Sequence, residues 1–251
     1  MMKKNSQDHG LKFYYVWDRP VRIFHWLNVL CVLGLIAIGV TILNAKELGI
    51  STDGKILLKT WHVYFGYVFV INLIIRIIWG FKSKNRYVQW RSILPKGEAY
   101  WDLFADYIVG LKKRKPVAFL GHNPLARLVV TVLFFLMSLQ ALTGLVLAGT
   151  DVYMPPFGGI IKQWVATDEA SVDTVKPYSK EGVDEASYQS MRTVRKPFIT
   201  LHYYTFYLLV AVLIFHIWGV VITEIRERNG IISAMFTGKK VFDSKPVDSD
   251  D

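Results

Sequence analysis

Two histidines fourteen residues apart, His202 and His216, lie in one uncharged stretch of 26 residues, Phe198–Thr223. A helix rises ~1.5 Å per residue and completes a turn in about 3.6 residues, so the two imidazoles would lie roughly 21 Å apart and within about 40° of one face. Imidazole is a common metal ligand. The spacing therefore predicts one helix that offers a metal ligand to each half of a bilayer.

Long apolar segments supply the elements that would carry such ligands. Hydrophobic residues make up 52% of the 251-residue chain. They concentrate in four segments of membrane-spanning length, in which Arg76 is the single charge: residues 23–43, 61–79, 128–147 and 198–223. Core helices of soluble proteins seldom lack charge over this length, and the short alternating strands of a membrane barrel are not visible. We predict an all-α integral membrane four-helix bundle with up-down topology.

Basic residues are distributed unequally between the loops. Residues 82–124 carry nine Lys and Arg against three acids, and the stretch up to Arg22 carries five against two, whereas loop 149–197 is near neutral. Cytoplasmic loops are enriched in Lys and Arg. We therefore expect the N- and C-termini in the cytoplasm, and we assign the net charge of +10 to topology and membrane lipid, including the basic tract at 112–115, and not to nucleic acid.

This topology divides the chain into a cytoplasmic N-terminus (1–22), a four-helix domain (23–228) and a cytoplasmic tail (229–251). Residues 98–111 have apolar side chains at three- and four-residue steps and predict an interfacial helix. Loop 149–197 is long for a compact bundle and is either a docking surface for a periplasmic partner or a local cap over the bundle. After Arg228 we expect a short interfacial helix and a disordered acidic end.

Four histidines lie in the predicted spans, where ionisable residues mark function by default. The topology places His25 and His216 near the cytoplasmic side, and His62 and His202 near the outer side. Matching depths gives an outer pair, His62 with His202, and an inner pair, His25 with His216. Two imidazoles fill both axial positions of a haem iron, which suits electron transfer, whereas zinc prefers three or four clustered ligands. We therefore predict two haem b groups.

Residues near these histidines fit bound haem. Gly66 follows His62 on the same helix face and would let a porphyrin approach, although small residues also serve helix packing. Arg76 lies at the inner level and is expected to pair with a haem propionate, with snorkelling to lipid headgroups as the alternative. Outer propionates have basic candidates at Lys59, Arg195 and Lys196.

Cysteine content and motifs limit the chemistry. The single cysteine, Cys31, excludes an intrachain disulfide, an iron–sulfur cluster and covalent c-type haem. No flavin, molybdopterin or nickel motif is visible. We expect an electron-transfer subunit without catalytic residues of its own.

Four segments resemble the b-type cytochrome subunit of nickel–iron hydrogenases and the related cytochrome b561 and formate dehydrogenase gamma subunits: VWDRPVRIFHWLNVLCVLGLIAIG, TWHVYFGY, GHNPLARLVV and ITLHYYTFYLLVAVLIFHIW. The resemblance implies that His25, His62, His202 and His216 bind two b haems. It further implies a quinone site at Asn123, with His122 and Arg22 at a matching depth. Asn123 before Pro124 also fits a helix N-cap.

The resulting functional hypothesis is a dihaem cytochrome b in the bacterial cytoplasmic membrane. It would pass electrons between the quinone pool and a periplasmic redox subunit such as a hydrogenase. A stand-alone quinol oxidoreductase feeding c-type cytochromes is the alternative, and a haem-free membrane anchor is a more distant one.

Overall fold

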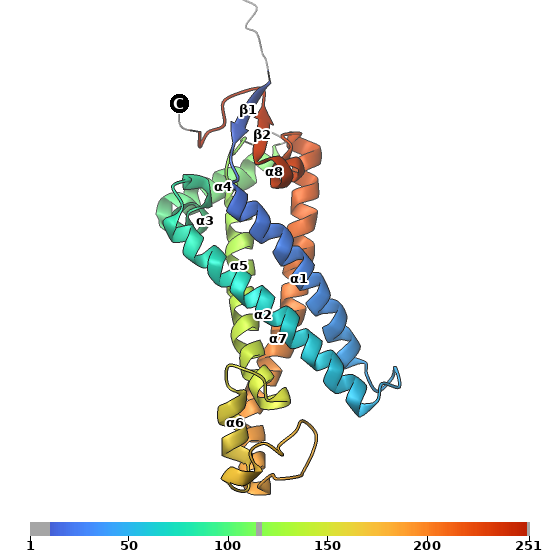
Figure 1. Ribbon diagram of the computed structural model, residues 1–251. Coiled ribbons are helices and arrows are strands. Elements are labelled where there is room, and N and C mark those ends of the chain that lie inside the picture. Colours follow the sequence, from blue (N-terminus) through green and yellow to red (C-terminus); the bar gives the residue numbers. More distant parts are fainter. Residues whose placement is uncertain (1–10, 114–116, 250–251) are drawn as a thin grey trace, which may run out of the picture. The chain divides into compact units, whose positions relative to one another are not determined.

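Four long helices dominate the computed structural model, which describes residues 11–113 and 117–249 (Figure 1). They are long and apolar enough to cross a membrane, and they contain the four predicted spans: α1 (Arg19–Leu43), α2 (Thr52–Lys82), α5 (Pro124–Val152) and α7 (Glu185–Glu227). Their large apolar side chains are mostly exposed, among them Leu30, Phe135 and Ile214, each more than 60% accessible. Exposed apolar surface on this scale fits lipid as the surrounding medium.

Each long helix begins at a polar residue that caps its first turn. Asp18, Ser51, Asn123 and Asp184 accept hydrogen bonds from backbone N–H groups three residues ahead. Such caps satisfy donors that the helix itself leaves unpaired. The caps explain why the helices begin several residues before the predicted spans, since hydropathy detects only the apolar part of a helix.

Shorter elements connect the long helices: β1 (Lys12–Tyr15), η1 (Arg86–Val88), α3 (Trp90–Ile93), α4 (Glu98–Lys112), α6 (Gly158–Val165), η2 (Glu169–Ser171), α8 (Ile231–Thr237) and β2 (Lys239–Phe242). Helix α4 covers the predicted interfacial helix. The basic tract at 112–115 lies partly outside the described residues, as do His9 and the last two acids of the chain.

The chain divides into two compact units. Unit 1 comprises Met1–His25, Ile75–Phe134 and Ala211–Asp251, and unit 2 comprises Trp26–Ile74 and Phe135–Val210. His25 and His216 fall in unit 1, whereas His62 and His202 fall in unit 2. Each unit therefore contains one of the two histidine pairs predicted from depth.

Unit 1 contains a small sheet that the all-α prediction missed. Strand β1 pairs antiparallel with β2, with Lys12 opposite Phe242 (Figure 1). Val16 and Val88 are fully buried in the cluster beside it, and Trp17 and the β2 residue Phe242 are nearly so. The tail is described through Ser249 and contributes α8 and β2. Four-residue strands separated by more than two hundred residues leave too short a pattern for sequence periodicity to detect.

Unit 2 carries a folded segment between α5 and α7. Helix α6 lies beside the first turns of α7 (Figure 1), and Val165, Val175 and Met191 form a fully buried cluster between them. The predicted loop 149–197 is thus partly helical at both ends, because α5 continues to Val152 and α7 begins at Glu185. This segment has its own small core.

Candidate haem-binding sites

His62 on α2 and His202 on α7 face each other within unit 2. Their ring centroids lie 6.5 Å apart at an interplanar angle of 72°. A metal–imidazole bond is about 2 Å long and a ring centre lies roughly 1.2 Å behind its nitrogen, so two imidazoles on opposite sides of one iron have centroids about 6.4 Å apart. The observed separation fits a single metal ion held between these two rings.

Thr143 on α5 fixes the orientation of His202. The Thr143 hydroxyl lies 2.8 Å from His202 Nδ1, and it donates a hydrogen bond to the Leu139 carbonyl at 2.8 Å. With its proton committed to Leu139, the hydroxyl accepts from Nδ1–H, and the lone pair of His202 is then on Nε2. Metal-bound histidines commonly have their second nitrogen tied in this way. Sequence reasoning missed Thr143, because a threonine within an apolar helix gives no spacing signal.

Two glycines lie against these imidazoles. A Cβ added at Gly39 would lie 3.4 Å from His62 Cε1, and one at Gly144 would lie 3.4 Å from His202 Cε1. Helices α1 and α5 therefore approach the two rings closely because those positions lack side chains. A Cβ at Gly66, the glycine predicted to face a porphyrin, would meet no protein atom within 4 Å. Space beside the predicted ligand His62 is what a flat macrocycle needs.

His25 on α1 and His216 on α7 interact electrostatically within unit 1. Among the described residues, no group of three or more His, Cys, Asp or Glu side chains is arranged to hold a metal ion. The facing arrangement of His62 and His202 suits axial ligation of a haem iron.

Arg76 is 4% exposed and lies beside two aromatic rings of unit 1 that contact each other. Its guanidinium is 5.2 Å from the ring of Trp90 and 5.5 Å from that of Phe134, and Nη2 donates to the Val88 carbonyl at 3.0 Å. The other terminal nitrogen, Nη1, is buried with no hydrogen-bond partner among the described residues. A buried guanidinium with an unused donor fits an anion such as a haem propionate better than it fits snorkelling to lipid.

Two of the three bases expected to serve the outer propionates are already paired. Lys59 and Arg195 both contact the Asp151 carboxylate, Arg195 at 3.0 Å. Arg195 also donates to the Thr150 carbonyl at 3.2 Å, and Lys59 to the Tyr178 hydroxyl. The sequence analysis overlooked Asp151, the acid that holds α2, α5 and α7 together at this level.

His122 lies close enough to His216 for the two rings to interact electrostatically. Burial, together with the nearby charges of Lys240 and Arg76 and the His216 ring, lowers the pKa of His122 to about 3. Its ring is 4.8 Å from that of Trp17, and its Nδ1 is buried without a hydrogen-bond partner among the described residues. His122 is therefore a neutral side chain with a nitrogen to offer a ligand.

The other two quinone candidates have structural roles. Asn123 Oδ1 accepts from the Ala126 backbone N–H at 2.8 Å and caps α5, with Pro124 in the first turn. Arg22 donates to the Phe236 carbonyl of α8. The structure thus supports the N-cap interpretation of Asn123, and it directs Arg22 toward α8.

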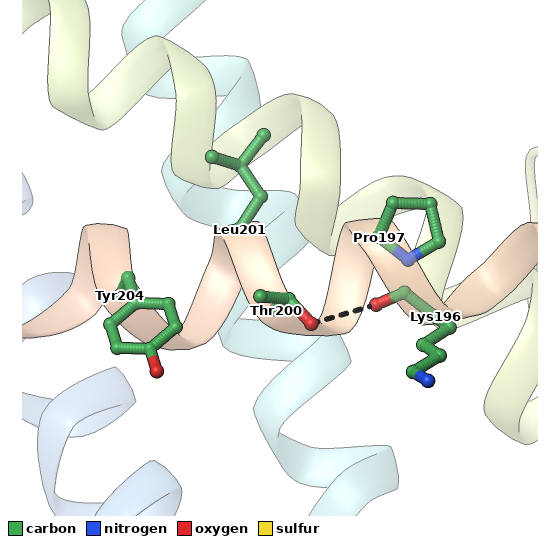
Figure 2. A pocket seen from close by; sticks show the side chains of 5 residues that line it. All are labelled: Lys196, Pro197, Thr200, Leu201 and Tyr204. Atoms are coloured by element: carbon green, nitrogen blue, oxygen red, sulfur yellow. Dashed lines mark hydrogen bonds between the residues drawn. The ribbon is translucent and has the colours of Figure 1, made fainter.

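An open groove of about 440 Å³ runs along α7 (Figure 2). Its lining is Lys196, Pro197, Thr200, Leu201 and Tyr204, all from this one helix, and Thr200 Oγ1 donates to the Lys196 carbonyl at 3.1 Å. A groove formed by a single apolar helix has few polar groups that converge on a ligand. It is a surface feature of α7 and not a candidate site.

Comparison with known proteins identifies the family of the chain. Residues 16–238 match the family described as "Prokaryotic cytochrome b561". A probable Ni/Fe-hydrogenase B-type cytochrome subunit from Cupriavidus necator is 24% identical over 240 residues, covering 93% of this chain and 89% of the relative. A probable Ni/Fe-hydrogenase 1 B-type cytochrome subunit from Escherichia coli K12 is 30% identical over 172 residues, covering 64% and 72%. A corresponding protein from Rhodobacter capsulatus is 25% identical over 238 residues, covering 91% and 81%.

No solved structure matches the chain. The family match extends from Val16 to Gly238 and includes all four long helices and their histidines. The chain therefore belongs to the prokaryotic cytochrome b561 family, as a multi-pass bacterial membrane protein that binds haem b and transfers electrons.

Proposed function

We propose that this chain holds two haem b groups and carries electrons across the bacterial cytoplasmic membrane. The observation that carries the proposal is the facing pair His62 and His202, whose centroid separation of 6.5 Å suits one iron. We pair His25 with His216 as the second ligand set, because both belong to the other unit and they influence each other electrostatically. A haem iron with two imidazole ligands supplies one-electron transfer and leaves no axial position for oxygen.

The protein's contribution is to hold and tune these ligands. Thr143 orients His202 and raises its basicity through the bond to Nδ1. Gly39 and Gly144 let α1 and α5 approach the imidazoles, while Gly66 leaves room for the porphyrin. Arg76 offers its unused donor to a propionate of the second haem.

The orientation of the chain in the membrane follows from the distribution of its basic residues. The basic 82–124 loop and both termini face the cytoplasm, which makes the His62–His202 site outer and the His25–His216 site inner. Quinone exchanges electrons at the inner side, and His122 is its best-supported contact because of its buried, unpaired Nδ1. Asn123 and Arg22 support this site less, since Asn123 caps α5 and Arg22 donates to the Phe236 carbonyl.

The redox partner is a periplasmic oxidoreductase. Relatives that match more than nine-tenths of this chain are named as cytochrome subunits of nickel–iron hydrogenases, and we extend that partner to this chain. Co-purification with a larger nickel- and iron-containing subunit tests the assignment. Purification as a separate protein that reduces c-type cytochromes with quinol would favour the stand-alone alternative.

Haem stoichiometry and pairing provide the main test. The purified protein should give a low-spin b-type reduced-minus-oxidised spectrum with two haems per chain. His62→Ala and His202→Ala should each deplete one haem, and His25→Ala and His216→Ala the other. His122→Ala is the matched control and should retain both. Depletion of the same haem by His25→Ala and His62→Ala would exclude the proposed pairing.

A further inference from the structure

A second cavity, of about 190 Å³, lies in unit 1 between η1, α3, α4 and the segment that leads into α5. It holds roughly six water volumes at about 30 Å³ each. Three guanidinium groups line it, from Arg86, Arg91 and Arg127, together with the hydroxyl of Ser92. The cavity is therefore large enough for a small anionic group and has the charge to bind one.

One carboxylate, that of Asp248, opposes these three positive charges in the lining. Its two oxygens accept hydrogen bonds from the backbone N–H groups of Leu120 at 2.5 Å and Gly121 at 2.8 Å. Arg86 reaches the Asp248 backbone carbonyl at 2.7 Å. The Asp248 carboxylate is therefore held by backbone N–H groups, and Arg91 and Arg127 outnumber it in the cavity lining.

Arg127 is held in place with one donor unused. Its Nη2 donates to the Leu94 carbonyl at 2.5 Å, and its guanidinium lies 4.9 Å from the ring of Tyr100. Its Nε is buried with no hydrogen-bond partner among the described residues. An unsatisfied buried donor on a charged group is costly unless a ligand completes it. Arg91, from α3, adds an exposed guanidinium to the same cavity.

We propose that this cavity binds a phosphate group that carries net negative charge. Guanidinium groups bind phosphate through paired, charge-assisted hydrogen bonds, and Arg91 and Arg127 would supply them from two different helices. A neutral quinone carbonyl would gain much less from this excess of charge. His122, proposed above as a quinone contact, also lines this cavity, whereas the four predicted haem ligands do not. The proposal therefore concerns a polar site that adjoins the quinone contact.

The surroundings favour a phospholipid headgroup as the source of the phosphate. Leu94, Leu103 and Leu125 are each about 40% exposed, and Leu103 lines the cavity itself. Basic pockets beside apolar helix surfaces are typical binding sites for anionic lipid headgroups. A lipid in this position would join α3 to the start of α5, whereas free phosphate would use the guanidiniums alone.

The test measures ligand binding to the delipidated full-length protein in detergent. The protein is titrated with phosphatidylglycerol, phosphatidylcholine or inorganic phosphate, and thermal unfolding is followed by circular dichroism of the helices, a readout separate from electron-transfer activity. Arg91→Gln should weaken binding of phosphatidylglycerol about tenfold, and Arg91→Gln/Arg127→Gln about a hundredfold. Arg19→Gln/Arg226→Gln removes two exposed arginines outside the cavity and should bind as the wild type does.

The outcomes separate the two sources of phosphate. If phosphatidylglycerol stabilises the wild type and this effect is lost in the arginine variants, the ligand is a lipid headgroup. If inorganic phosphate alone gives the same arginine-dependent stabilisation, the ligand is a free anion. Equal binding by the wild type and the double variant, or phosphatidylcholine binding as tightly as phosphatidylglycerol, would overturn the proposal. Arg91 is exposed, so its single variant keeps the test valid where the double variant fails to fold.

Discussion

Replacing Thr143 by valine should selectively weaken haem binding at the His62–His202 site. Thr143 is 2% exposed, and its hydroxyl lies 2.8 Å from His202 Nδ1. Valine keeps the shape but leaves the Nδ1–H group buried without an acceptor, which costs about 1–3 kcal/mol. Loss of a hydrogen-bond partner behind a metal ligand commonly weakens metal affinity by about 10–100-fold, or roughly 1.4–2.7 kcal/mol.

The assay follows haem loss from each site. Purified protein is mixed with an excess of a high-affinity haem scavenger, and the two phases of haem transfer are resolved in the visible spectrum. Thr143→Val should accelerate one phase by about 10–100-fold and leave the other unchanged. The accelerated phase should be the one that is absent in His202→Ala.

Thr150→Val is the matched control for this substitution. Thr150 lies on the same helix, is 4% exposed and donates to the Val146 carbonyl at 2.9 Å, much as Thr143 donates to Leu139. Among the described residues, Thr150 makes no hydrogen bond to a histidine. If Thr143→Val loses haem no faster than Thr150→Val, the bond to His202 does not support a metal ligand and the argument fails.

Three further substitutions test other features. Gly66→Leu should lower haem binding at the outer site, measured as haem content per chain. The apoprotein should stay intact, because an added Cβ meets no atom of the described residues within 4 Å. Asp151→Asn should destabilise unit 2 by about 1–3 kcal/mol, because it leaves the partly buried Lys59 and Arg195 without their shared carboxylate; thermal unfolding measures this. Burial lowers the pKa of Lys240 from its ordinary 10.5 to about 8, so the unfolded chain binds more protons between these values and wild-type stability should rise with pH across that window. Lys240→Met should remove the rise.

Each of these expectations has a control. Gly159→Leu also adds a side chain where no protein atom lies within 4 Å, and equal haem loss in both glycine variants would argue against a porphyrin at Gly66. Asp173→Asn removes an exposed acid of the α5–α7 segment. If Asp173→Asn loses as much stability as Asp151→Asn, the Asp151 salt bridges are not the cause of the loss. Lys239→Met removes the exposed neighbour of Lys240 and should retain the pH dependence; a wild-type profile that is flat from pH 8 to 10.5 would contradict the assignment to Lys240.

The membrane helices were predictable because their signal is large and local. A charge-free stretch such as Phe198–Thr223 has few structural alternatives, and the positions of His202 and His216 follow directly from helix geometry. The family resemblance noted in the same segments is confirmed by the match over residues 16–238. The depth argument placed His62 with His202, and the structure brings these two rings together.

Features that depend on contacts between distant segments were not predictable. The pairing of Lys12 with Phe242 rests on strands too short to give a periodic pattern. Met191 is fully buried in the polar first turns of α7, where hydropathy indicates a loop. Thr143 acquires a role only because α7 brings His202 beside it. In each case the decisive partner lies far away in the sequence.

The salt-bridge cluster around Asp151 leads to a redox prediction. Lys59 and Arg195 share this one carboxylate, so the three groups together carry one net positive charge, and Asp151→Asn increases that charge by one. A haem gains an electron on reduction, so added positive charge near the His62–His202 site stabilises the reduced form. The midpoint potential of the outer haem should therefore rise in Asp151→Asn, with a smaller rise at high salt. Lys59→Gln should lower the same potential. A redox titration in which both substitutions shift it in one direction would show that unfolding, and not charge, caused the change.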